Sequence, residues 1–134
     1  MAEDRKKVVN FWLKSANEDW DLALELVKLK RHYRNALFFG QLTLEKILKA
    51  LYYQSLEGHP LPIHNLSLLA KNVGLELDDT AREELREISS FNISARYDNI
   101  KQAFYRKATP EFVKIWMEKI ADYRKTYLSL FNKV

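Results

Sequence analysis

The residues best suited to binding chemistry in this sequence are Arg96, Tyr97 and Asp98, which are consecutive. A guanidinium group forms a planar fork that matches phosphate, and an aromatic ring beside it offers a surface on which a base can stack. Residues 96–107 hold four basic residues and one acidic residue, and Lys101 is the first cation after Arg96. This segment therefore predicts a binding site for a ligand that carries phosphate.

A structural role for Arg96 is the alternative, and we weigh it slightly above the ligand-binding role. The guanidinium could pair with Asp98, Glu45 or Asp19 inside a helical bundle and brace the end of a helix. The sequence leaves both roles open.

Four polar residues upstream are candidates for supporting such a site: Asp19, Glu45, Lys49 and His64. Asp19 interrupts an apolar stripe, and Glu45 shares a four-residue ladder with Lys49, so either carboxylate could orient a basic group. His64 should open a short helix, where it could face a phosphate. The favoured interpretation is structural: ties between helices, a solvated pair of Glu45 with Lys49, and packing for His64.

Composition excludes several classes of site. The 134-residue chain has no cysteine, which removes disulfides, thiolate nucleophiles and cysteine-bound zinc, and its three histidines lack metal-site spacing. We therefore expect no metal site and assign no catalytic residue. No stretch predicts a secretion signal or a membrane span, so we expect a cytoplasmic protein. The net charge of +4 permits an anionic partner without identifying one.

Helical periodicity and capping signals divide the chain into about five helices. A loop is required at Gly58-His59-Pro60-Leu61-Pro62. Thr80 with Glu83 resembles a capping box, and Thr109-Pro110 suits the start of a helix. The expected helices cover residues 4–31, 33–56, 64–72, 80–93, and 109 to the C-terminus.

No segment has the alternation or the turn pairs of a β-hairpin. The prediction is therefore an all-α fold, an antiparallel four- to five-helix up-and-down bundle, with residues 1–134 forming one domain. Small residues beside the apolar stripe of the second helix, Gly40 among them, predict close helix packing.

Several motifs on this helical framework resemble those of the HEPN family, and together they cover most of the chain. They are Ala16-x-x-Asp19-x-x-Leu22-Ala23, Gln41-x-x-x-Glu45-Lys46-x-x-Lys49-Ala50, His64-x-Leu66-x-x-Leu69, and Ala95-Arg96-Tyr97 at the expected end of the fourth helix. Each motif alone is weak, but their order and spacing are moderately specific.

The resemblance implies a helical bundle, often a homodimer, that binds nucleotides, cleaves RNA, or partners a minimal nucleotidyltransferase in a toxin-antitoxin pair. The ribonuclease branch of the family has an Arg followed, after four to six residues, by His. This sequence has Ile100, Lys101, Gln102 and Ala103 after Arg96, and all three histidines lie upstream. The standard ribonuclease motif is therefore missing, and we lean towards a protein that is not an enzyme.

The leading hypothesis is a non-catalytic or weakly active protein that binds a nucleotide or RNA through Arg96, Tyr97, Asp98, His64 and Lys101. It would partner a separately encoded nucleotidyltransferase, and no cofactor is expected beyond a nucleotide ligand. One alternative is an RNA-cleaving toxin with a nonstandard set of residues. Another is a purely structural bundle that docks a protein and binds no ligand.

Overall fold

The structure of the protein is a computed structural model that describes residues 2–92 and 98–131. The helices are α1 (Ala2–Lys28), α2 (Tyr33–Ser55), α3 (Leu66–Asn72), α4 (Asp79–Ser89), α5 (Asp98–Lys107) and α6 (Pro110–Leu128). The described ranges contain no strand, so the predicted all-α class is confirmed. Six helices are described where four or five were expected, because α5 is a separate helix.

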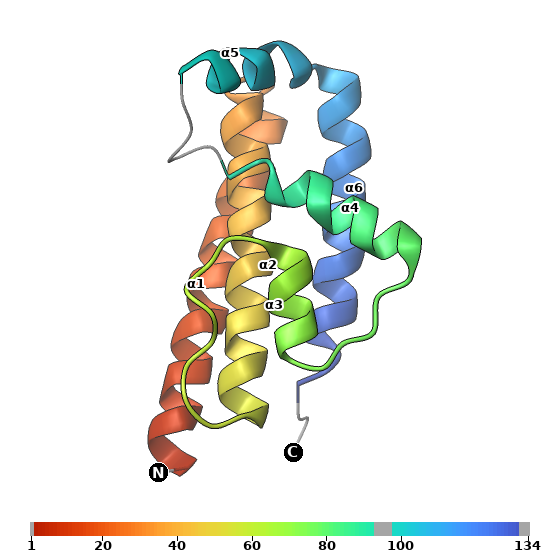
Figure 1. Cartoon of the computed structure of the whole chain (residues 1–134). Coiled ribbons are helices and arrows are strands. Elements are labelled where there is room, and N and C mark those ends of the chain that lie inside the picture. Colours follow the sequence, from red (N-terminus) through yellow and green to blue (C-terminus); the bar gives the residue numbers. More distant parts are fainter. Residues whose placement is uncertain (1, 93–97, 132–134) are drawn as a thin grey trace.

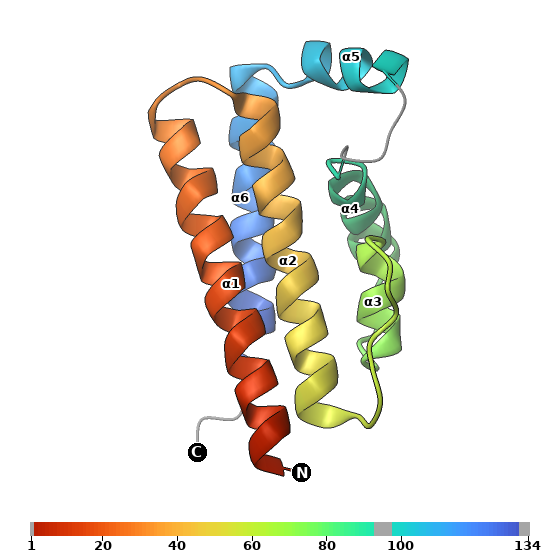
Figure 2. The ribbon, with the colours of Figure 1, turned by 90° about the vertical axis from the view of Figure 1, so that its left-hand side faces the viewer.

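Helix α2 is the centre of the arrangement and packs against α1, α3, α4 and α6 (Figure 1). Helix α1 runs antiparallel to it, as expected for consecutive long helices with a short connection. Helix α5 crosses one end of the bundle, so α6 runs in the same direction as α2 (Figure 2). Helices α3 and α4 cover the side of α2 that α1 and α6 leave open.

The central place of α2 follows from its sequence, because a helix that is apolar on most of its sides must be buried on most of its sides. Its apolar residues point towards all of its neighbours, and small residues lie between the large ones. The buried residues of α2 are Ala36, Leu37, Gly40, Gln41, Thr43, Leu44, Glu45, Ile47, Leu48, Ala50 and Leu51. Three of these, Gln41, Thr43 and Glu45, have polar side chains that need partners inside the protein. Thr43 donates to the backbone oxygen of Phe39 in its own helix at 2.8 Å.

Helices α2 and α6 approach each other closely at Gly40. A methyl group built at Gly40 would lie 2.8 Å from the Cδ1 atom of Ile120 and 3.5 Å from the sulfur of Met117. Both neighbours belong to α6 and are buried. The predicted close packing of α2 is therefore confirmed, and its partner is α6.

The ends of three helices differ from the sequence prediction. Helix α1 ends at Lys28 rather than near Arg31, and Lys30 and His32 then adopt positive φ angles of 57° in the turn before α2. Helix α4 is capped by Asp78, whose carboxylate accepts from the backbone N–H of Ala81 at 2.7 Å, rather than by Thr80. Aspartate and threonine are both good N-caps, so the sequence alone did not separate them.

The third helix also starts later than expected. Asn65 caps it by accepting from the backbone N–H of Leu68 at 3.1 Å, so α3 begins at Leu66 and His64 lies before the cap. The predicted cap at Thr109 is confirmed, because its hydroxyl accepts from the N–H of Phe112 at 3.2 Å.

Helix α4 ends at Ser89 and not near residue 93, where the prediction placed it. Phe91 turns inward and packs against the rings of Phe104, Phe112 and Trp116, while the Asn92 side chain turns towards α2. Burial of these two consecutive side chains takes the chain off the helix axis. The sequence prediction placed residues 95–97 at the close of the fourth helix, and these residues lie outside the described part of the chain.

An ion pair with an added hydrogen bond ties α4 to α6. The Glu84 carboxylate accepts from Lys119 Nζ at 2.6 Å and from the Tyr123 hydroxyl at 2.7 Å. The hydrogen bonds from Lys119 and Tyr123 lower the pKa of Glu84, and burial raises the pKa of Tyr123. The carboxylate therefore stabilises the fold at neutral pH, and this contribution is lost as the pH falls through its lowered pKa.

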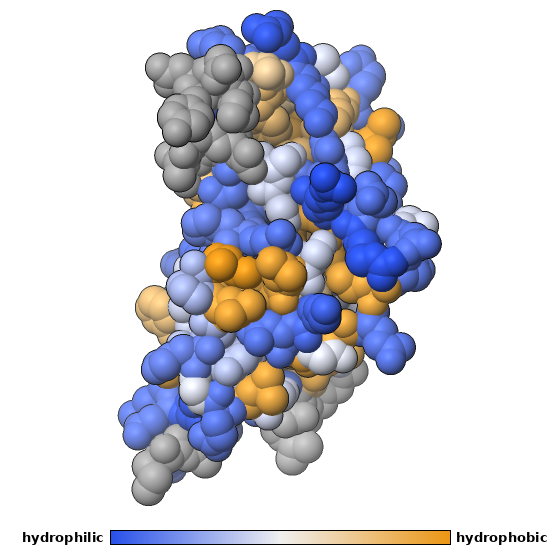
Figure 3. Space-filling view, in the orientation of Figure 1, coloured by the Kyte–Doolittle hydropathy of each residue, from blue (hydrophilic) through white to orange (hydrophobic). Residues whose placement is uncertain are grey.

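The face of the molecule seen in Figure 3 is mainly hydrophilic, with an apolar patch near α3 and smaller apolar areas elsewhere. Among the described residues, no helix is both long enough and apolar enough to cross a bilayer.

The first prediction concerns the contact at Gly40. Gly40→Leu should lower the free energy of unfolding by about 1–3 kcal/mol, because the larger side chain must displace Ile120 in a packed interface. Chemical denaturation would measure this. Asn35→Leu, on an exposed position of the same helix, is the matched control and should change stability by less than about 0.5 kcal/mol. Equal effects of the two variants would contradict close packing at Gly40.

Candidate functional site

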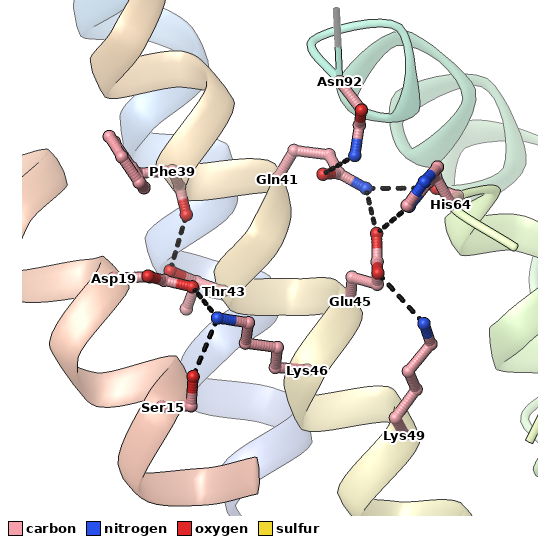
Figure 4. A network of polar contacts seen from close by, with 10 residues as sticks. All are labelled: Ser15, Asp19, Phe39, Gln41, Thr43, Glu45, Lys46, Lys49, His64 and Asn92. Atoms are coloured by element: carbon pink, nitrogen blue, oxygen red, sulfur yellow. Dashed lines mark hydrogen bonds and ion pairs between the residues drawn. The ribbon is translucent and has the colours of Figure 1, made fainter. Parts of the chain in front are cut away.

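The Glu45 carboxylate is the centre of a buried polar cluster between α2, α3 and the end of α4 (Figure 4). Its side chain is only 6% exposed. It accepts three hydrogen bonds, from Gln41 Nε2 at 3.1 Å, His64 Nδ1 at 2.8 Å and Lys49 Nζ at 3.0 Å. A carboxylate removed from water needs such donors, because an unpaired buried charge costs several kcal/mol.

The helical ladder Gln41, Glu45, Lys49 forms as its spacing predicted, since residues four apart lie on one side of a helix. The prediction that Glu45 and Lys49 form a solvated pair is wrong. The Lys49 side chain is 12% exposed, and its Nζ atom lies 5.7 Å from the centre of the Trp12 ring of α1. Neighbouring helices cover both members of the pair, so the ion pair is internal.

His64 is held at two points by residues of α2. Its ring nitrogen Nδ1 contacts Glu45, and its backbone oxygen accepts from Gln41 Nε2 at 3.0 Å. Because His64 precedes the cap of α3 instead of opening the helix, its side chain can turn towards α2. The imidazole nevertheless remains 58% exposed.

The contact with Glu45 assigns roles to the two ring nitrogens of His64. A carboxylate oxygen accepts, so Nδ1 carries the hydrogen, and in the neutral ring Nε2 keeps its lone pair. When the ring is protonated, Nε2–H becomes a donor instead. The exposed edge of the ring can therefore accept a proton, or donate a hydrogen bond to an anion.

Asn92 completes the cluster and was missed by the sequence analysis. Its Nδ2 donates to Gln41 Oε1 at 3.0 Å, and the residue is 7% exposed. Gln41 thereby uses its oxygen for Asn92 and its nitrogen for Glu45 and His64. The sequence offered one signal, since Asn92 lies just before the Ala95-Arg96-Tyr97 motif, but no spacing rule links Asn92 to Gln41.

Asp19 belongs to a different cluster on the side of α2 that faces α1. Its carboxylate pairs with Lys46 Nζ at 2.6 Å, and the same ammonium group donates to Ser15 Oγ at 2.7 Å (Figure 4). The structure therefore places Asp19 in a tie between α1 and α2 and does not bring it to Glu45.

The remaining candidate residues follow Asn92 along the chain. Arg96 and Tyr97 lie outside the described residues. Asp98 is the first residue of α5, and Lys101 lies on that helix with a half-buried side chain. The described residues thus bring together His64, Glu45 and Lys49, and they add Gln41 and Asn92.

The chemistry open to this cluster is limited. No group of three or more His, Cys, Asp or Glu residues suited to a metal ion occurs in the part of the chain that the structure describes. Lys49 balances the charge of Glu45, which leaves the exposed imidazole of His64 as the group that can meet a ligand. The arrangement suits binding of an anion, or a single proton transfer.

The fold and the site define a class of protein: a helical bundle with a buried polar cluster against its central helix. The HEPN domain family model matches residues 9–125, so the chain belongs to the HEPN family. The resemblance seen in the sequence motifs is thereby confirmed. No curated protein and no solved structure matches the chain.

The second prediction tests the burial of the Glu45 charge. Glu45→Gln should lower the free energy of unfolding by about 3 kcal/mol, because it leaves the Lys49 ammonium buried without its counter-charge. Adding Lys49→Met to this variant should recover part of the loss, since no buried charge then remains. Thermal and denaturant unfolding would measure both variants.

The matched control is Glu83→Gln, which removes an exposed carboxylate 4.0 Å from Arg86. It should change stability by less than about 1 kcal/mol. A loss at Glu45 no larger than the loss at Glu83 would show that the cluster is solvated.

Proposed function

We propose that this HEPN domain binds a nucleotide or RNA at a site formed by His64 together with Arg96, Tyr97, Asp98 and Lys101. The proposal rests on the way in which His64 is held by its neighbours. Its backbone and its Nδ1 atom are both held by buried residues, while most of its ring faces solvent.

The hold on His64 reduces the cost of binding. An exposed side chain normally loses conformational freedom when a ligand orders it, which costs about 0.5–1.5 kcal/mol. Glu45 and Gln41 impose that order before any ligand arrives. A preorganised imidazole with one free edge suits a hydrogen bond to phosphate or to a base.

Connectivity supports a shared site for His64 and Arg96. The Asn92 side chain donates a hydrogen bond to Gln41, and Gln41 also donates one to the backbone oxygen of His64. Only three residues lie between Asn92 and Arg96. The four steps from one Cα atom to the other span at most about 14 Å. A nucleotide is long enough to contact groups separated by this distance.

The proposed protein is non-catalytic or weakly active, because no histidine follows Arg96 at the spacing of the ribonuclease branch. As the resemblance implies, it would form a homodimer. It would be located in the cytoplasm, with residues 1–134 as one domain. A separately encoded minimal nucleotidyltransferase would be its partner in a toxin-antitoxin pair. Exposed apolar side chains on α1 and α6, Phe11 and Ile115 above all, offer surface for such contacts.

A second candidate function is RNA cleavage with a nonstandard set of residues. The pair of Glu45 and His64 favours it, since a carboxylate that orients an imidazole is a common arrangement for proton transfer. In that case His64 would take the proton that the missing downstream histidine takes in the ribonuclease branch.

The third prediction concerns binding at the proposed site. Arg96→Ala should weaken binding of a nucleotide or short RNA by about 1.5–3 kcal/mol, the scale of a charge-assisted hydrogen bond, with little change in Tm. Arg96→Lys should recover little of this, because an ammonium group lacks the fork. Calorimetric titration with nucleoside monophosphates would measure the affinities, and His64→Ala should weaken them too.

His59→Ala is the control for His64, because His59 is also exposed and lies in the proline loop, away from the cluster. A large loss of Tm in Arg96→Ala, with unchanged affinity, would show that Arg96 braces the fold instead of binding the ligand.

The fourth prediction separates the two candidate functions. The purified chain should leave a defined RNA intact in the presence of a chelator, because Arg96 has no suitably spaced histidine to handle the 2′-hydroxyl proton. Gel analysis of labelled RNA would test this. Efficient cleavage that His64→Ala abolishes would favour the second candidate.

A further inference from the structure

Several segments of the sequence hold basic residues and no acidic one, and two of them meet at one end of the fold. Residues 26–44 contain four basic residues and no acidic one, and residues 99–110 contain three basic residues and no acidic one. Together the two segments hold seven basic residues and no acidic one. The seven residues are Lys28, Lys30, Arg31, Arg34, Lys101, Arg106 and Lys107, and they are called the basic end below.

The fold brings the two segments together. The turn between α1 and α2 lies at the end of the bundle that α5 crosses (Figure 2). The guanidinium carbon of Arg34, on the first turn of α2, lies 4.0 Å from the centre of the Tyr105 ring of α5. This stacking contact joins two residues that are 71 positions apart in the sequence.

Most charges of the basic end have no acidic partner. Lys107 Nζ pairs with Glu87 at 2.5 Å. The other six residues form no ion pair within the described ranges, and Lys30, Arg31 and Arg106 are exposed. Like charges gathered on one surface repel one another, and an anionic partner relieves that repulsion.

The side chains of the basic end suit a nucleic acid better than a lipid surface. Arginine planes and exposed aromatic rings stack on bases, and Arg34 with the partly exposed Tyr105 provides both groups. A membrane-bound helix also needs a face of bulky apolar side chains. Among the large hydrophobic residues described as exposed, this end has only Leu29 and Tyr105.

We propose that the basic end binds the phosphate backbone of a single-stranded nucleic acid whose terminal or central nucleotide occupies the His64 site. Helix α5 connects the two places, because it begins at Asp98 in the proposed site and ends at Lys107 in the basic end. The ligand is therefore a chain of several nucleotides, not a mononucleotide. This inference rests on the proposed function and extends it.

The fifth prediction tests the basic end by charge reversal. The triple variant Lys30→Glu, Arg31→Glu, Arg106→Glu should weaken binding of a labelled single-stranded RNA of about 12 nucleotides by roughly 30-fold or more. Each lost phosphate contact removes about 0.7 from the slope of log K against log salt, so the slope should flatten by about two. Fluorescence anisotropy between about 50 and 200 mM salt would measure both quantities.

The matched control is Lys7→Glu, Lys14→Glu, Lys125→Glu, which changes the net charge equally at exposed positions of α1 and α6. Circular dichroism would show that both triple variants fold. The control should lose less than about threefold in affinity and should keep the slope. Equal losses in the two variants would overturn the inference, because the effect would then follow net charge alone.

Binding measurements with other ligands identify the class of partner. Single-stranded DNA of the same length shows whether the backbone alone is recognised, and either nucleic acid supports the inference. Vesicles of phosphatidylcholine with phosphatidylserine, or an acidic peptide, overturn it if they bind at the basic end more tightly than both nucleic acids do.

Uridine monophosphate separates this inference from the proposed function. Its affinity should fall in His64→Ala and stay unchanged in the triple variant of the basic end. If the RNA binds no more tightly than the monophosphate, the inference fails while the proposed function stands. If the RNA depends on the basic end but not on His64 or Arg96, the proposed site fails while the inference stands.

Discussion

Burial of the Glu45 charge is the constraint on which the rest of the site depends. A carboxylate inside the bundle requires donors from several directions, and Gln41, Lys49 and His64 supply them. Two of these donors also organise another part of the chain. His64 fixes the loop before α3, and Gln41 binds Asn92 at the end of α4. One buried charge thus links three elements whose apolar residues also share the hydrophobic core.

The central helix gives this cluster its rigidity. Helix α2 is packed by α1, α3, α4 and α6, so its backbone has little freedom to move when a ligand contacts His64. Sites on packed helices hold their geometry better than sites on loops do. His64 itself belongs to a loop, but its position derives from the helix.

Much of the fold could be predicted from the sequence, because helical periodicity, the proline loop and the cap at Thr109 are local signals. The ladder of Gln41, Glu45 and Lys49 was also predictable from its spacing. The burial of that ladder was not, because exposure depends on α1 and α3, which lie far away in the sequence. The same reason explains the missed end of α4, where Phe91 and Asn92 turn inward to distant partners. Arg34 and Tyr105 likewise meet only in the folded chain.

The order of the helices along the chain has a consequence for how the protein folds. Helices α1 and α2 are neighbours in sequence and pack along their length, so their hairpin can form from local contacts, which are the fast ones. Helix α6 contacts α2, and its Arg124 reaches Asn17 of α1 across a separation of 107 residues. Closing a loop of that size costs entropy before any contact repays it. The α1 and α2 hairpin should therefore act as a template, and the polar surface around Glu45 should lose its water only when the later helices dock.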